Sequence, residues 1–241
     1  MNEKTTLFDW ISRASKCVFF GGAGVSTESG IPDFRSENGL YTALNQYGRS
    51  PETLLSHSFF EAHPDIFFDY YRKNLLVTDV DPNTAHRALA AMEADGKLKA
   101  VITQNIDGLH QKAGSKNVLE LHGSIYRNYC TECGKTYGFE VIRDAESVPH
   151  CSCGGIIRPD VVLYEEPLNA ATMGKAAEAV MSADLLIIGG TSLSVYPAAG
   201  LIDYFRGDHL VLINKSITPY DSGADLIIRE PIGEVFSAYF S

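Results

Sequence analysis

Two closely spaced cysteine pairs are the clearest chemical signal in the sequence. Cys130 and Cys133 are separated by two residues, Cys151 and Cys153 by one, and seventeen residues lie between the pairs. Four thiolates at such spacing complete a tetrahedron around a structural zinc ion and leave no position for a reacting water. The fifth cysteine, Cys17, lies in an apolar run and is expected to be an inert core residue. The sequence therefore predicts one structural zinc ion held by the two pairs.

A second signal is a glycine-rich turn that follows an apolar run. Gly22-Ala23-Gly24 comes directly after Val18-Phe19-Phe20. Backbone N–H groups at such a turn can hold the pyrophosphate of a dinucleotide, although a plain tight turn is the alternative. The usual dinucleotide fingerprint is incomplete, because Thr27 stands where a third glycine is expected and no acidic residue follows about 20 residues later. The turn favours phosphate binding and argues against an ordinary dehydrogenase.

Four further stretches place polar residues at the ends of expected strands. They are Thr103-Gln104-Asn105-Ile106-Asp107, Leu119-Glu120-Leu121-His122-Gly123, Gly189-Gly190-Thr191-Ser192-Leu193 and Ile213-Asn214-Lys215. Each could be a plain turn, and Asn105 and Asp107 could be helix caps. The ring of His122 titrates near neutral pH, which suits a general base if a substrate hydroxyl lies within reach. Because ligands bind at the carboxyl edge of an open parallel sheet, the convergence predicts one site there.

Short apolar runs alternate with helical patterns, and these elements must position the polar residues. Strands are predicted at residues 17–22, 99–103, 161–163, 185–188, 210–213 and 225–228, and helices at 4–15, 84–95, 169–182, near 197–206 and at the C-terminal end. This alternation predicts an α/β fold with a parallel sheet covered on both faces. Two stretches, 32–77 and 126–158, lack the alternation and are predicted to be insertions.

The overall composition limits the function classes. The chain has 241 residues, 45% of them hydrophobic, and a net charge of −10. No apolar run is long enough to span a bilayer and the N-terminal residues favour a helix over a signal peptide, so we expect a cytoplasmic protein with no membrane contact. The acidic charge argues against direct nucleic-acid binding and is compatible with lysine-rich partners.

In combination these motifs resemble the sirtuin family of NAD-dependent protein deacylases of bacterial type. The stretches that carry the resemblance are GAGVSTESGIPDFR, TQNIDGLH, LHG, the two cysteine pairs, GTSLSVYPAA and IN, and the similarity runs from about residue 7 to 236. The resemblance implies a Rossmann-like, doubly wound parallel sheet with a smaller zinc-binding and helical module inserted. The NAD-binding domain would comprise residues 1–31, 78–125 and 159–241, and the small domain 32–77 and 126–158.

The resemblance also implies roles for individual residues. NAD, a co-substrate that is consumed, would be contacted by Gly22, Ala23, Gly24, Thr27, Phe34, Arg35, Gln104, Asn105, Ile106, Asp107, His122, Thr191, Ser192, Asn214 and Ile232. Two of them would be catalytic: His122 as the general base, and Asn105 by ordering the ribose and a water. The stretch from Ser26 to Arg35 would close over the nicotinamide. The substrate would be bound by Val161, Val162, Tyr164 and Val195.

The implied reaction is deacetylation of a lysine side chain at the expense of NAD. Its products would be free lysine, nicotinamide and O-acetyl-ADP-ribose, which makes the enzyme an acyltransferase. The expected partners are acetyl-lysine proteins or peptides, and the expected state is a monomer. Two alternatives share the same scaffold, namely a protein ADP-ribosyltransferase and a deacylase of another acyl type. A zinc-ribbon nucleic-acid or adaptor module is disfavoured because the cysteine segment has few basic residues.

The sequence departs from the family pattern at three informative places. Glu165 stands where the family has glycine, and the pair Cys151 and Cys153 has one spacer where two are usual. Relatives that remove succinyl or malonyl groups have a Tyr-x-x-Arg, whereas here Tyr71 is followed by Asn74 at the arginine position. Because an acidic acyl tail would then lack a bidentate partner, the sequence predicts a preference for acetyl-lysine.

Overall fold

A six-stranded parallel sheet forms the centre of the larger part of the molecule. The computed structural model describes residues 2–32 and 43–240, so the predicted NAD contacts Phe34 and Arg35 lie outside the described residues. The strands are β1 (Cys17–Gly21), β2 (Leu98–Thr103), β3 (Val118–Glu120), β7 (Leu185–Gly189), β8 (His209–Ile213) and β9 (Leu226–Ile228). Their spatial order is β3-β2-β1-β7-β8-β9, and every neighbouring pair is parallel. This is the order of a doubly wound nucleotide-binding sheet, whose switch point lies between β1 and β7.

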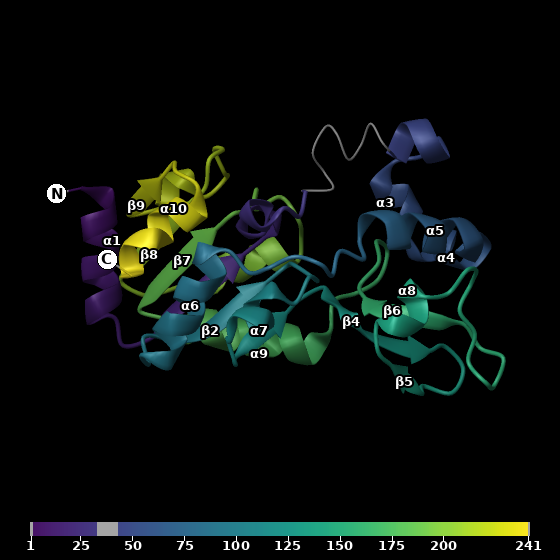
Figure 1. Ribbon diagram of the computed structural model, residues 1–241. Coiled ribbons are helices and arrows are strands. Elements are labelled where there is room, and N and C mark those ends of the chain that lie inside the picture. Colours follow the sequence, from purple (N-terminus) through teal and green to yellow (C-terminus); the bar gives the residue numbers. More distant parts are fainter. Residues whose placement is uncertain (1, 33–42, 241) are drawn as a thin grey trace.

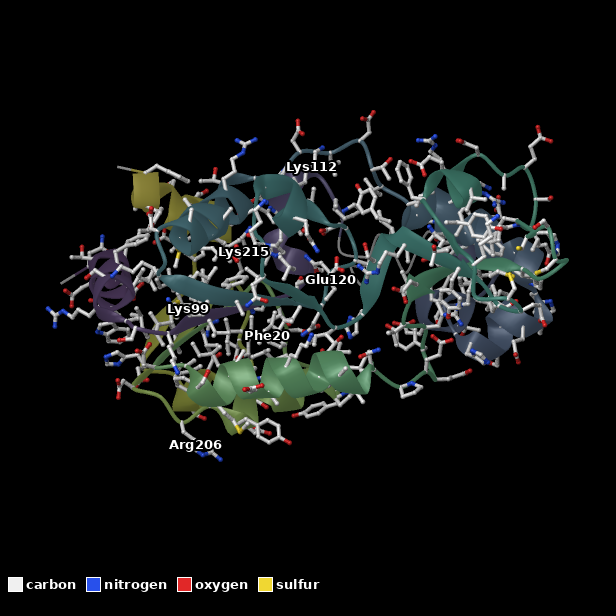
Figure 2. All side chains as sticks on the ribbon, turned by 90° about the horizontal axis from the view of Figure 1, so that it is seen from below. Phe20, Lys99, Lys112, Glu120, Arg206 and Lys215 are labelled. Carbon is white, nitrogen blue, oxygen red and sulfur yellow. The ribbon has the colours of Figure 1, made fainter. Side chains whose placement is uncertain are left out.

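Helices cover both faces of this sheet. One face packs against α1 (Glu3–Arg13), α6 (Thr84–Ala94) and α10 (Ile232–Ser237), and the other against α9 (Ala170–Ser182) and the 3-10 helix η3 (Ala198–Tyr204). Phe19 and Phe20 are both completely buried, Phe19 in the first of these layers and Phe20 in the second. Figure 2 shows Phe20 between the sheet and α9. The central strands are continuously apolar because side chains alternate between two buried faces.

A second, smaller part lies at the end of the molecule away from both termini (Figure 1). Its sheet has the order β5-β4-β6 and is antiparallel, with β4 (Gly123–Cys130), β5 (Thr136–Tyr137) and β6 (Ile157–Val161). Four helices pack around it: α3 (Pro51–Leu54), α4 (His57–Ala62), α5 (Pro64–Asn74) and α8 (Glu140–Arg143). Their shared core is rich in buried aromatic rings, among them Phe60, Phe67, Phe68 and Tyr71. The short helix α7 (Leu109–Ala113) follows β2 in the larger part.

The predicted fold class is confirmed, with corrections to individual elements. The strand predicted at 161–163 is wrong: β6 ends at Val161 and belongs to the small antiparallel sheet, because the N–H groups of Val162 and Leu163 bind His122 and Glu166 instead of a parallel neighbour. The segment near 197–206 forms a 3-10 helix, and α1 ends at Arg13 because Asp184 binds the N–H groups of Ser15 and Lys16. The domain boundaries stay a prediction. Strand β4 extends across the boundary expected between residues 125 and 126.

Within the described residues, no helix combines the length and apolar character needed to cross a membrane.

Candidate active site

The loops after β1 and β7 touch through glycine backbones. The N–H of Gly24 donates to the carbonyl oxygen of Gly190 at 2.8 Å, and the N–H of Gly22 donates to Gly189 at 3.3 Å. A Cβ on Gly24 would lie 2.8 Å from the Cα of Gly190, which itself has a φ of +60°. Only glycine permits this approach. The two amides are engaged within the protein, and the role of Gly22 and Gly24 as NAD contacts stays a prediction.

A buried polar network links the loop after β1 to the loop after β2. The hydroxyl of Ser26 donates to the carboxylate of Asp107 at 2.7 Å and accepts from the Nδ2 of Asn105 at 3.0 Å. The other oxygen of Asp107 accepts from the N–H of Leu109 at 2.9 Å, so the aspartate also caps α7. Burial raises the pKa of Asp107 above its usual range. The network fixes the orientation of the Asn105 and Asp107 side chains.

Two buried histidines lie behind this network. His86 is on α6, accepts at Nδ1 from the N–H of Asn83, and has its Nε2 3.5 Å from the Ser26 hydroxyl. His110 is on α7, and the centre of its ring is 4.7 Å from that of His86. Burial lowers the pKa of His86 to about 4 and that of His110 to about 3. Both rings are therefore neutral at physiological pH.

His122 lies in the turn between β3 and β4. Its Nδ1 is 2.9 Å from the carbonyl oxygen of Gln104, which follows β2. Since a carbonyl oxygen only accepts hydrogen bonds, Nδ1 carries the proton in the neutral ring and Nε2 is the atom that can accept one. Gly123 has a φ of +81°, and a Cβ there would collide with the backbone of Asp160 on β6. The glycine of Leu121-His122-Gly123 therefore holds the histidine at the junction of the two sheets.

One cavity of about 310 Å³ brings most of the predicted residues together. From the predicted NAD contacts it is lined by Ala23, Gln104, Asn105, Ile106, Asp107, His122, Thr191 and Ser192, and from the predicted substrate residues by Val161, Val162, Tyr164 and Val195. Within the described residues, the buried Nε2 of Gln104 has no hydrogen-bond partner. A buried orphan donor in a cavity calls for a polar ligand, so the residues present fit a nucleotide such as NAD.

Other predicted contacts lie away from the cavity lining. The hydroxyl of Thr27 donates to the carbonyl of Gly24, and the Nδ2 of Asn214 donates to the carbonyl of Ser216. Ile232 is the first residue of α10 and is buried in the core, with only 4% of its surface exposed. The roles of all three stay predictions.

Some residues that the structure places in the cavity wall were not predicted to contact NAD or the peptide. They are chiefly Ser26, Leu55, Asn74, Glu165, Glu166 and Tyr196. A signal was available for Ser26, which lies inside the glycine-rich turn motif, and for Glu165, which departs from the family glycine. Leu55 and Asn74 come from the irregular stretch 32–77, whose sequence pattern does not indicate which residues face the cavity.

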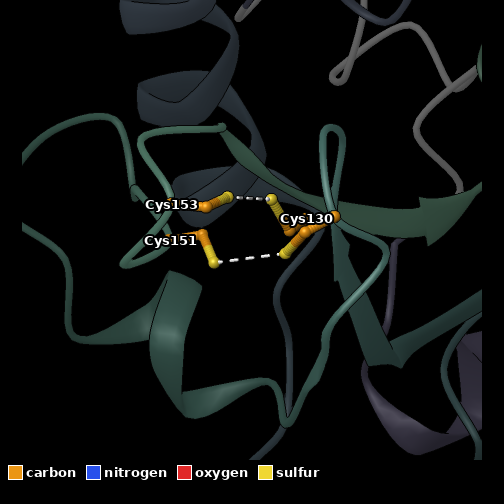
Figure 3. A group of neighbouring side chains, drawn as sticks. Cys130, Cys151 and Cys153 are labelled. Carbon is orange, nitrogen blue, oxygen red and sulfur yellow. Dashed lines mark hydrogen bonds between the residues drawn. The ribbon is translucent and has the colours of Figure 1, made fainter.

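The four paired cysteines form a single cluster (Figure 3). All four sulfur atoms lie within 4.8 Å of one another, with Cys130 and Cys153 at 3.4 Å and Cys133 and Cys151 at 3.6 Å. A tetrahedral zinc site with bonds of about 2.3 Å places sulfur atoms roughly 3.8 Å apart, so the donors fit a zinc ion. The single spacer between Cys151 and Cys153 is accommodated within this arrangement.

Hydrogen bonds lower the pKa of two of the four thiols. The backbone N–H of Cys133 lowers the pKa of Cys130, and the backbone N–H of Cys153, with the Tyr137 hydroxyl, lowers the pKa of Cys151 to about 5. Lower thiol pKa values favour the thiolate, which is the form that binds metal. The hydroxyl of Tyr137 donates to the sulfur of Cys151 at 3.0 Å.

The chain is similar to known proteins in both sequence and structure. Residues 22–197 match the model of the Sir2 family. An NAD-dependent protein deacetylase of Clostridium perfringens is 60% identical over 238 residues, which cover 98% of both chains. One from Clostridium acetobutylicum is 59% identical over 227 residues, which cover 93% of both chains. A solved structure of Sir2 with a p53 peptide and NAD+ superimposes with a TM-score of 0.88 and 37% identity, covering 99% of this chain and 97% of the other. The chain therefore belongs to the Sir2 family.

Proposed function

We propose that this chain is an NAD-dependent protein-lysine deacetylase. The observation that carries the proposal is the convergence of Gln104, Asn105, Asp107 and His122 with the segment 161–164 on one cavity. Its relatives at 59% and 60% identity bear the same activity in their names. The products are deacetylated lysine, nicotinamide and O-acetyl-ADP-ribose, so the enzyme is an acyltransferase that consumes NAD.

The inner end of the cavity holds the nicotinamide side of the nucleotide. When bound, NAD supplies a ribose carbon that becomes electron-poor as neutral nicotinamide leaves. Asn105 and Asp107 present amide and carboxyl groups there, and Ser26 fixes both through hydrogen bonds of 3.0 and 2.7 Å. A fixed, water-poor polar environment stabilises developing charge better than water, because its dipoles need no reorganisation.

His122 acts as the general base. Its Nδ1–H is held by the carbonyl of Gln104, so Nε2 is the basic atom of the ring and takes a proton from a ribose hydroxyl. Transfer of this proton to His122 makes the hydroxyl oxygen nucleophilic toward the acyl carbon. The acetyl-lysine oxygen is a weak nucleophile and must be held against the sugar carbon. Such positioning can offset roughly 7–11 kcal/mol of the activation barrier and supplies most of the remaining rate enhancement.

The substrate lies along residues 161–164 and contacts Val195, which also lines the cavity. Val162 is fixed by its N–H to the carbonyl of His122, and Tyr164 by its N–H to the carbonyl of Leu55, both at 3.0 Å. Within the described residues, no lysine or arginine lines the cavity, and Asn74 occupies its wall. A neutral acetyl group therefore suits the site better than a succinyl or malonyl tail.

The four cysteines hold one structural zinc ion. Four thiolates saturate its coordination, so the metal stabilises the small part of the molecule and takes no part in the reaction. The proposal includes a cytoplasmic location, since reduced thiols persist there. It also includes a monomeric state and no direct binding of nucleic acid.

In a direct test, the protein is incubated with an acetyl-lysine peptide and NAD that is labelled in its ADP-ribose part. The proposal predicts loss of acetyl from the peptide only when NAD is present, with the label recovered in O-acetyl-ADP-ribose. Label attached to protein would instead support the ADP-ribosyltransferase alternative. Parallel succinyl and acetyl peptides test the acyl type, and comparable kcat/KM values for both would contradict the acetyl preference.

A further inference from the structure

Glu165 occupies a strained position at the rim of the cavity. Its φ is +77°, in the left-handed region that disfavours every residue with a side chain except where neighbours enforce it. The side chain is exposed, and the residue belongs to the cavity lining. Glycine would adopt this conformation without strain. The glutamate therefore has a contact or a charge that offsets the backbone cost.

One offsetting contact is with the start of helix α4. The Glu165 carboxylate accepts from the N–H of Ser58 at 2.9 Å and from its hydroxyl at 3.0 Å. Ser58 lies in the first turn of α4, where a negative charge is favourable. These bonds hold the glutamate in place and leave its charge intact.

The charge of Glu165 is unbalanced, unlike that of its neighbour. Glu166 is bound by both terminal nitrogens of Arg158, at 2.6 and 3.0 Å, and by the Nδ1 of His57 at 2.8 Å. Within the described ranges, Glu165 makes no ion pair. The other acid in the lining, Asp107, is buried at the inner end among Ser26 and Leu109. Glu165 is thus the carboxylate that gives the outer rim a negative charge.

The backbone of Glu165 is also open to a ligand. The residues before it are tied down, because Tyr164 pairs with Ser56 in a parallel bridge and the side chain of Glu166 binds the N–H of Leu163. Among residues 2–32 and 43–240, nothing hydrogen-bonds to the N–H or the C=O of Glu165 itself. An extended peptide that adds along this segment can pair with those groups. Its side chains next to the modified lysine would then pass close to the carboxylate.

We infer that Glu165 is a specificity-determining residue that selects acetyl-lysine peptides with a lysine or arginine beside the modified residue. The inference rests on the proposed function and adds the class of peptide substrate. The net charge of −10 acts in the same direction at longer range. Since the contact is remote from the reacting atoms and forms when the peptide binds, it changes KM more than kcat.

The experiment measures steady-state deacetylation of matched peptides with NAD. Each position flanking the acetyl-lysine is set in turn to Lys, Gln or Glu, at low and high salt. For an exposed ion pair the expected preference for Lys over Gln is about 2- to 5-fold in kcat/KM, with Glu below Gln, and it should shrink at high salt. Equal values for all three peptides would overturn the inference. No deacetylation of any peptide would overturn the proposed function and the inference with it.

Two variants assign the preference to Glu165. In Glu165→Gln the amide can still hydrogen-bond Ser58, but the charge is lost. The ratio of kcat/KM for the Lys-flanked peptide to that for the Gln-flanked peptide should therefore fall to about 1. Glu178→Gln removes the same charge from an exposed position on α9, outside the cavity lining, and should keep the preference. A preference that persists in Glu165→Gln, or disappears equally in Glu178→Gln, would contradict the inference.

Discussion

The cysteine cluster and the cavity are two polar sites built in opposite ways. The cluster draws its four ligands from a stretch of 24 residues, Cys130 to Cys153, and local backbone N–H groups tune its sulfurs. The cavity draws its residues from the ends of β1, β2, β3 and β7, which meet only after the sheet has formed. A site made from one short stretch depends on its metal, whereas a site made from strand ends depends on the packing of loops.

The two sites are nevertheless connected by two strands. β4 begins at Gly123, next to His122, and ends at Cys130, the first sulfur of the cluster. β6 returns from the cluster to Val161 in the cavity wall. Loss of order at the cluster should therefore reach the cavity through these two strands.

Removal of zinc should have the largest effect. Apparent binding free energies of structural zinc are on the order of 10 kcal/mol, which exceeds what the small core around Cys130, Cys151 and Ile157 can replace. We expect chelation to increase hydrogen exchange across residues 130–156 and to abolish deacetylation, while β1 and β7 stay protected. Metal analysis should find one zinc per chain. A reduced, folded protein without zinc, or unchanged exchange after chelation, would contradict the structural role.

Substitution His122→Ala should separate chemistry from folding. Removal of a general base typically lowers rates by about 10²–10⁴-fold. Because His122 lies in a turn and is not part of a hydrophobic core, thermal unfolding and NAD binding should change little. The measurement is kcat/KM for an acetyl-lysine peptide, with NAD binding by calorimetry as the control. Normal turnover in this variant would remove His122 from the mechanism.

Substitution Gly190→Ala should destabilise the loop contact that shapes the cavity. A Cβ at Gly190 would lie 2.6 Å from the carbonyl carbon of Gly24, and both partners are backbone. Overpacking added to a left-handed φ is expected to cost about 2–4 kcal/mol of unfolding free energy. Gly96→Ala is the matched control, because Gly96 has a φ of +74° and a Cβ there meets nothing within 4 Å. Equal losses in chemical denaturation would show that the loop contact contributes nothing.

The buried histidines should make the larger part sensitive to acid. Their pKa values are depressed in the folded state, to about 4 for His86 and about 3 for His110, so the unfolded chain binds protons first as the pH falls below about 6.5. Stability is complete above that pH and is lost toward pH 4, by about 2 kcal/mol per histidine between pH 7 and 5.

His110→Phe tests this pH dependence. Within the described residues neither ring nitrogen of His110 has a hydrogen-bond partner, so an apolar ring should be tolerated. The unfolding free energy is measured by urea denaturation at several pH values. Its loss between pH 7 and 5 should be smaller in the variant by the contribution of one histidine, about 2 kcal/mol. A variant with the parent's slope would contradict the assignment.

The residues of the cysteine cluster were predicted from the sequence more completely than those of the cavity. The spacing of the cysteines was enough to predict that they form one cluster. The rule that ligands bind at the carboxyl edge of a parallel sheet was enough to predict that Asn105, Asp107 and His122 share a cavity. The antiparallel pairing of β6 and the strained backbone of Glu165 were not predictable, because they depend on contacts with residues distant in the sequence, β4 for the first and Ser58 for the second. The hydrogen bonds of Ser26 to Asn105 and Asp107 were not predictable either, because both partners come from the loop after another strand.

The most direct test of the account is the stoichiometry of the reaction. The protein is incubated with NAD and an acetyl-lysine peptide, and all products are quantified by mass spectrometry. The account predicts one nicotinamide and one O-acetyl-ADP-ribose for each lysine deacetylated. Free acetate with intact NAD, or an unchanged peptide after prolonged incubation, would contradict it.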